Sequence, residues 1–150
     1  MITHVVAKTL VFDETGKLLL LKRSVSDNHR PGGLDLPGGK VEEGEEIVAG
    51  ALREVKEESG LVIDPQHIDW VYADTVAAYN TDHKTNVNML RATFIARVHK
   101  PKVTLSHEHD AYSWHTIDEA LIKVANLRYE LVLRYLIKND IASEYWKNEE

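Results

Sequence analysis

Three glutamates of one predicted helix carry the strongest chemical signal in this sequence. Glu54, Glu57 and Glu58 are spaced at i, i+3 and i+4, which places their carboxylates on one side of a helix. Like charges one turn apart repel each other, so helix stability alone does not explain the cluster. Hard oxygen ligands that converge on one point bind Mg²⁺ or Mn²⁺, and water and phosphate oxygens complete the coordination. A solvated acidic helix face, paired with Arg53 and Lys56, is the alternative that the helix by itself leaves open.

The helix is predicted from the residues around these carboxylates. Glu45 and Glu46 are expected in its first turn, where the helix dipole favours negative charge. Gly60 is expected to end it as a left-handed C-terminal cap. The face that packs on the core is predicted from an apolar stripe at helical spacing, formed by Val48, Ala51, Leu52 and Val55.

The spacing of this segment resembles the signature of the Nudix hydrolase family, G-x5-E-x7-R-E-U-x-E-E-x-G-U, in which U is an aliphatic residue. The resemblance implies a loop–helix–loop that binds a metal and a diphosphate, in an enzyme that hydrolyses a nucleoside diphosphate linked to another group. It also implies the α/β Nudix fold, an α/β/α sandwich with a mixed β-sheet between helices. Every specified position is filled without a gap or substitution, by Gly39, Glu45, Arg53, Glu54, Val55, Glu57, Glu58, Gly60 and Leu61.

The resemblance also implies roles for single residues. Glu54 and Glu58 would be the closest ligands of a Mg²⁺ ion, or of Mn²⁺ in its place, and Glu57 would assist. Arg53 would orient the carboxylates, whereas a plain surface ion pair would contribute little. Glu45 is expected to be auxiliary, through water or a salt bridge to Arg53. The expected metal ligands are the carbonyl of Gly38 and the carboxylates of Glu54, Glu57, Glu58 and Glu108; the expected catalytic residues are Arg53, Glu54, Glu57, Glu58 and Glu108.

Glu108 enters this set from a later loop. Family members often carry a further carboxylate just before a strand with a tryptophan, and Glu108 lies six residues before Trp114. It would complete metal binding or act as the general base, a role that a glutamate of the motif could also take; an exposed loop acid is the alternative. His107 and His109 flank it, and an H-x-H pair on a strand makes a zinc site conceivable. The carboxylates, however, already describe a hard-metal site.

Substrate-binding residues are expected before and after the motif. Lys22, Arg23 and Arg30 would meet phosphates or stack on a base. Gly39 lets the backbone approach a ligand closely. Tyr79 follows Leu61 by 18 residues, near the place where dinucleoside polyphosphate hydrolases carry a tyrosine.

The expected substrate is a nucleoside triphosphate or a related nucleotide. A dinucleoside polyphosphate hydrolase is one alternative, and a non-catalytic nucleotide sensor on the same fold is another. An intact carboxylate set argues against a pure sensor, because binding alone requires no activated water.

Composition limits the kinds of protein and partner that this sequence allows. A chain of 150 residues with 43% hydrophobic residues is long enough for one domain, with a C-terminal tail or short docking helix at about residues 139–150. The absence of cysteine excludes a disulfide scaffold and a cysteine nucleophile. A net charge of −6 without a basic stripe argues against general nucleic-acid binding. No apolar run has the ~18 residues of a membrane span, so we expect a cytoplasmic protein with no membrane partner. The sequence leaves the oligomeric state open, with a homodimer as one option.

The order of elements is predicted to be strands, the motif helix, more strands, and then helices. Residues 5–12 and 17–23 are predicted to form a hairpin, with both faces covered. Residues 77–86 are predicted to be a polar loop near the substrate. Further strands are expected at 61–63, 68–76 and 87–98, and helices at 117–124 and around Leu127 to Leu136.

Overall fold

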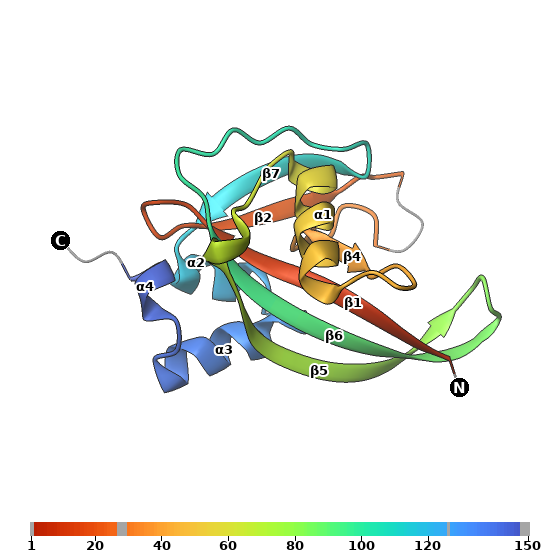
Figure 1. The fold of residues 1–150 in the computed structure, drawn as a ribbon. Coiled ribbons are helices and arrows are strands. Elements are labelled where there is room, and N and C mark those ends of the chain that lie inside the picture. Colours follow the sequence, from red (N-terminus) through yellow and green to blue (C-terminus); the bar gives the residue numbers. More distant parts are fainter. Residues whose placement is uncertain (1, 27–29, 126, 148–150) are drawn as a thin grey trace.

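The structure, a computed structural model, describes residues 2–26, 30–125 and 127–147. Along the chain, strands come before and after the first helix, and the other α-helices follow the last strand (Figure 1). In chain order the elements are β1 (Thr3–Phe12), β2 (Leu18–Arg23), β3 (Leu34–Asp35), β4 (Gly38–Lys40), α1 (Ile47–Ser59), the 3₁₀ turn η1 (Pro65–His67), β5 (Ile68–Asn80), β6 (Thr85–Arg97), β7 (His109–His115), α2 (Ile117–Lys123), α3 (Tyr129–Asn139) and α4 (Ser143–Trp146).

The sheet is mixed and is organised around β1. Strand β6 runs parallel to β1 and pairs with it over the whole length of β1, and β5 is antiparallel to β6. The other edge of β1 is shared, because β4 pairs with it at residues 6–8 and β2 meets it only where Phe12 faces Leu18. The predicted hairpin of residues 5–12 and 17–23 is therefore paired only at its closed end. Once β4 occupies the edge of β1, β2 pairs instead with β3 and β7.

Helices cover both faces of the sheet, which confirms the predicted α/β/α sandwich (Figure 1). Alternate residues of β1 point to opposite sides, as strand geometry requires. Val11 packs in the core cluster that includes α1, and Leu10 packs in the cluster that includes α2 and α3. The apolar stripe of α1 faces the first cluster as predicted, with Ala51 and Val55 buried.

The two ends of α1 differ in how well they were predicted. Gly60 ends the helix with φ 74°, and its N–H donates to the carbonyl of Lys56, as expected. The placement of Glu45 and Glu46 in the first turn is wrong. Glu46 is the N-cap, whose carboxylate accepts hydrogen bonds from the N–H groups of Val48 and Ala49. Glu45 lies outside the helix, where its carboxylate is occupied by other donors.

The region after α1 contains the largest local differences from prediction. Residues 61–63 are not a strand and lead into η1. Residues 77–86 are not mainly a loop, because β5 runs to Asn80 and β6 starts at Thr85, so the turn occupies only 81–84. The ladder between the two strands continues to the pair Asn80 and Thr85, because its hydrogen bonds join backbone N–H and C=O groups, which polar residues carry as well as apolar ones.

The C-terminal helices agree more closely with prediction. The hydroxyl of Thr116 accepts a hydrogen bond from the N–H of Glu119 and so caps α2. The second helix starts at Tyr129, which leaves Leu127 in front of it. In the expected tail, Tyr145 and Trp146 pack against the core cluster of α3, and the Tyr145 hydroxyl donates to Asp69 at 2.8 Å; residues 148–150 lie outside the described residues. Across the described ranges, no helix has the length and apolarity needed to cross a membrane.

Candidate active site

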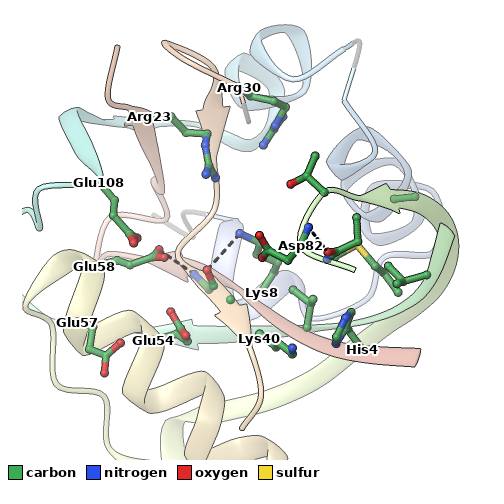
Figure 2. Close-up of a pocket in the computed structure, with 18 of the residues that line it drawn as sticks. His4, Lys8, Arg23, Arg30, Lys40, Glu54, Glu57, Glu58, Asp82 and Glu108 are labelled. Carbon is green, nitrogen blue, oxygen red and sulfur yellow. Dashed lines mark hydrogen bonds between the residues drawn. The ribbon is translucent and has the colours of Figure 1, made fainter. Parts of the chain in front are cut away.

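A cavity of about 860 Å³ lies beside α1 and has walls of three kinds (Figure 2). In the view of Figure 2 the glutamates lie together at the left, Arg23 and Arg30 lie at the top, and Lys8 lies between the two groups. The acidic wall contains Glu54, Glu57, Glu58 and Glu108; the basic wall contains Lys8, Arg23, Arg30 and Lys40; the third wall, from β1 and the β5–β6 hairpin, contains Val6, Ala78, Tyr79, Val87 and Met89.

Glu58 is the most deeply placed of the acidic residues. Its side chain is buried, and its Oε2 accepts a hydrogen bond from the N–H of Gly38 at 3.0 Å. Burial raises the pKa of Glu58 to about 8, and the Lys8 charge and the Gly38 hydrogen bond offset only part of that rise. Burial also raises the pKa of Glu54. Two carboxyl groups that lack full charge compensation therefore face the cavity, as expected of groups that bind a cation.

Arg53 connects the acidic wall to the loop before α1. Its Nη1 donates to Glu54 at 3.1 Å and to Glu57 at 3.2 Å, and its Nη2 donates to the carbonyl of Lys40 at 3.2 Å. The carboxylate of Glu45 accepts from Nε at 2.8 Å and from Nη2 at 3.0 Å. Of the two contacts considered for Glu45, the structure contains the salt bridge. Arg53 is thus held on one side by Glu45 while it touches two of the glutamates that line the cavity.

The glycines in front of the motif are needed for this arrangement. A Cβ atom on Gly39 would lie 2.8 Å from the carboxylate of Glu54, so only glycine lets that carboxylate approach β4. Gly38 has φ 152°, and a Cβ there would lie 2.1 Å from the carbonyl oxygen of Ala7. The carbonyl of Gly38 accepts a hydrogen bond from Lys8 Nζ at 3.2 Å.

The donor set fits a hard divalent cation. Carboxylate and carbonyl oxygens are the ligands that Mg²⁺ and Mn²⁺ prefer. The recess at Gly39 and the uncompensated carboxyl of Glu58 are features that such an ion would use. Within the described residues, no three acidic or histidine side chains already converge on one point. Glu54 and Glu57 instead share a hydrogen-bond donor, Arg53 Nη1, whereas Glu58 accepts from the N–H of Gly38.

Glu108 lines the cavity on the same side as Glu58 (Figure 2). Its loop is fixed to β2, because the N–H of Ser24 donates to the Glu108 carbonyl at 2.8 Å. The strand geometry considered for a zinc pair does not hold. Strand β7 begins at His109, which is buried, whereas His107 precedes the strand and is exposed.

The predicted substrate-binding residues fall into two groups. Arg23, Arg30, Gly39 and Tyr79 line the cavity. Tyr79 does so from the end of β5, with 63% of its surface exposed, and not from a loop. Lys22 is exposed and is not among the lining residues, because neighbours along a strand point to opposite faces.

Sequence reasoning missed Lys8 and Asp35. Lys8 lines the cavity from β1, and Asp35 lies behind it, hydrogen-bonded to its ammonium. The available signal was a single lysine inside an otherwise apolar strand, since such a charge is buried only when it is paired.

Comparisons with known proteins agree with this architecture. A family model described as the NUDIX domain matches residues 2–136. Among solved structures, a MutT protein from Methanosarcina mazei Go1 is similar, with 25% identity and a TM-score of 0.71 over 93% of this chain and 96% of that chain. A search of the curated proteins finds no match.

Two more distant structures share the fold alone. An Ap4A hydrolase from C. elegans has 19% identity and a TM-score of 0.67, over 93% of this chain and 98% of that chain. The dihydroneopterin triphosphate pyrophosphohydrolase of E. coli has 21% identity and a TM-score of 0.67, over 93% of this chain and 99% of that chain. Since the family model spans most of the sequence and the fold agrees with it, the chain belongs to the Nudix family and is a hydrolase of nucleotide diphosphate bonds.

Proposed function

We propose that this protein is a Mg²⁺-dependent pyrophosphohydrolase that cleaves a nucleoside triphosphate or a related nucleotide and releases a nucleoside monophosphate or the equivalent fragment. The observation that carries the proposal is the buried carboxyl of Glu58, which lies with Glu54 in a cavity whose other walls are cationic and apolar. A nucleotide has matching parts: a phosphate chain that needs positive charge and a base that stacks on apolar or aromatic surface.

The motif residues would hold the cation that the reaction requires. Mg²⁺ bound by the carboxylates and by the Gly38 carbonyl would neutralise charge on phosphate oxygens and make a bound water more acidic. Arg53 would fix the positions of Glu54 and Glu57, and Glu45 would fix Arg53. The ligands we assign are Gly38, Glu54, Glu57, Glu58 and Glu108, with Mn²⁺ as an alternative ion.

The bond change is a substitution at phosphorus. A water oxygen forms the new P–O bond, and the bridging P–O bond breaks, so that its oxygen leaves with the departing phosphate. A carboxylate of the acidic wall takes the proton of the water, and Glu108 and Glu58 are both placed in the cavity for that role.

The third wall supports a nucleotide as the substrate. Val6, Val87 and Met89 present apolar surface beside the exposed ring of Tyr79. A base would stack on that ring while its phosphates reach the charged walls.

A dinucleoside polyphosphate is the second candidate substrate. If one base packs on Val6, Val87 and Met89, the exposed ring of Tyr79 is left for a second base, which favours this candidate. Similarity of fold to an Ap4A hydrolase is compatible with this candidate.

A nucleotide panel with Mg²⁺ tests the proposal. Products would be identified by mass, and reactions run in ¹⁸O-labelled water would locate the attacked phosphorus. Turnover of a nucleoside triphosphate or dinucleoside polyphosphate by the wild type, lost in Glu58→Gln, supports the proposal. Tight binding of nucleotides without turnover would instead establish a sensor.

A further inference from the structure

Asp35 is a buried carboxylate that contacts three cationic side chains. It is 1% exposed, and its oxygens lie 3.1 Å from Lys8 Nζ, 2.7 Å from Arg23 Nη1 and 3.7 Å from Arg30 Nη2. The hydroxyl of Tyr129, the first residue of α3, also donates to it. Strands β1, β2 and β3 and helix α3 thus meet at one carboxylate.

The three cationic residues at Asp35 all line the active-site cavity (Figure 2). Lys8 is 8% exposed, and its ammonium contacts Asp35 on one side and the carbonyl of Gly38 on the other. Lys8 therefore stands between the buried carboxylate and the group we assign as a metal ligand.

The charges at this position are maintained by their mutual contacts. Burial alone would lower the pKa of Lys8, but the adjacent Asp35 carboxylate raises it above the ordinary value. Burial alone would raise the pKa of Asp35, but the Lys8 charge and the hydrogen bonds from Tyr129 and Lys8 lower it. The geometry agrees with these directions, since Lys8 and Asp35 form a buried ion pair at 3.1 Å.

Stability alone does not explain such a cluster. Buried ion pairs contribute little compared with apolar residues of the same volume, because desolvation offsets the Coulomb attraction. The charged ends also face a cavity, where an ammonium and a guanidinium are suited to phosphate oxygens. The Lys8 ammonium has three N–H donors spread over four acceptors at 3.1–3.3 Å, so a phosphate oxygen can replace one of them.

We propose that Asp35 positions Lys8 and Arg23 to bind a phosphate group of the substrate beyond the diphosphate held at the α1 glutamates. The enzyme then prefers chains of three or more phosphates to two-phosphate substrates. The inference rests on the proposed function, since it assigns a further part of the same site. Asp35 is a positioning residue, and Lys8 and Arg23 touch the substrate.

The hydrogen bond from Tyr129 of α3 to Asp35 can be removed without disturbing the packing around it. Tyr129 is buried, and the guanidinium of Arg91 lies over its ring at 5.0 Å from the centroid. The ring is thus fixed independently of its hydroxyl. Tyr129→Phe would remove one donor to Asp35 and leave the packing in place.

The test compares two non-hydrolysable analogues, the α,β-methylene diphosphate and triphosphate of adenosine, by calorimetry with Mg²⁺. The measured quantity is the ratio of their dissociation constants. We expect the wild type to bind the triphosphate at least about tenfold more tightly, as a charge-assisted contact to the third phosphate requires. Lys8→Met should reduce this ratio to about threefold or less, and Asp35→Asn should reduce it as well. Lys17→Met, which removes the same charge from an exposed turn, should leave the ratio unchanged.

A merely structural role gives a different result. Lys8→Met leaves Asp35 in contact with Arg23, Arg30 and Tyr129, so we expect the variant to fold, and thermal unfolding would check this. A lower melting temperature with an unchanged ratio overturns the proposal. Lys8→Arg, which keeps the charge, should retain most of the ratio. A separate hydrolysis assay of the wild type decides the proposed function, so that failure there is distinguishable from failure of the third-phosphate site.

Discussion

The guanidinium of Arg53 is held in a two-point contact by Glu45, with its Nε at 2.8 Å from one carboxylate oxygen and its Nη2 at 3.0 Å from the other. This geometry fixes the plane of the guanidinium and directs its remaining nitrogen toward Glu54 and Glu57. Glu45 thus acts on the acidic wall through Arg53, although it lies outside α1.

The Arg53–Glu45 contact predicts a pH dependence. The hydrogen bond from Arg53 lowers the pKa of Glu45 from 4.5 to about 2. Because the folded-state value is the lower one, the stabilising contribution is present above pH 4.5 and is lost as the pH falls toward 2. Carboxyl NMR titration should show this low pKa in the wild type and a higher pKa in Arg53→Gln, where only the hydrogen bond from the Glu42 N–H still lowers it. The difference in melting temperature between wild type and Glu45→Gln should also shrink over that interval. A Glu45 pKa near 4.5 in the wild type would exclude the contact in solution.

Glu58→Gln should abolish most turnover without unfolding the protein. The variant loses a proposed metal ligand, and we expect a decrease in kcat of at least about a hundredfold. The fold should persist, because the amide oxygen can still accept the hydrogen bond from Gly38 and no buried charge is created. Steady-state kinetics with Mg²⁺ and thermal unfolding measure the two effects. Glu43→Gln, the same change at an exposed position, is the matched control; near-normal turnover in Glu58→Gln would refute the ligand assignment.

Arg53→Ala should have a smaller effect on kcat than Glu58→Gln, together with weaker metal binding. Loss of the guanidinium removes its hydrogen bonds to Glu54 and Glu57 and leaves the repulsion between these two carboxylates uncompensated. We expect metal affinity to fall by about tenfold, the lower end of the range for residues that orient metal ligands. Electron paramagnetic resonance titration with Mn²⁺ measures this affinity directly. Arg53→Lys should fail to restore it, since an ammonium cannot reproduce the two-point contact with Glu45; unchanged Mn²⁺ affinity in Arg53→Ala would contradict the orienting role.

The two glycines before α1 should respond differently to alanine. In Gly39→Ala the three atoms nearest the new Cβ all belong to the Glu54 carboxyl, the end of a flexible side chain, so the protein should fold while Glu54 is displaced and turnover falls. In Gly38→Ala the new Cβ meets the backbone of β1, and the positive φ adds strain of about 1–3 kcal/mol, so stability should fall as well. Melting temperature and kcat, measured on both variants, separate the two effects. Equal melting temperatures for the two would show that β4 adapts more freely than its pairing with β1 suggests.

Much of the acidic wall was predictable from sequence because its geometry is local. Residues three and four apart on a helix share a face whatever surrounds them, so Glu54, Glu57 and Glu58 could be placed together in advance. The cap at Gly60 could likewise be predicted, because it depends only on neighbouring residues of the same chain segment. A salt bridge between Glu45 and Arg53 was one of the two contacts expected, beside a contact through water, and the structure contains the salt bridge.

The basic wall depends on long-range contacts and was therefore found only in part. Asp35 is 27 residues from Lys8 and 94 residues from Tyr129, and nothing in the local sequence brings them together. Both strands of the β5–β6 hairpin were predicted, but their extension through residues 77–80 and 85–86 was missed for a related reason. Its pairing is fixed by the register of a ladder that starts at Ile68 and Ala96, far from the polar residues near Asn80.

Strand β1 is hydrogen-bonded along both edges, by β6 on one side and by β4 and β2 on the other. The hairpin tip extends beyond the first β1 pair, Thr3 with Asn88, and there it consists of two strands only. The middle of the sheet, which supplies Lys8, is thus fixed in place, whereas the hairpin tip that supplies Tyr79 can exchange its side chains with little cost to the fold. Substitutions at the hairpin tip could therefore change which base the protein binds, while the residues that act on the phosphate chain stay in place.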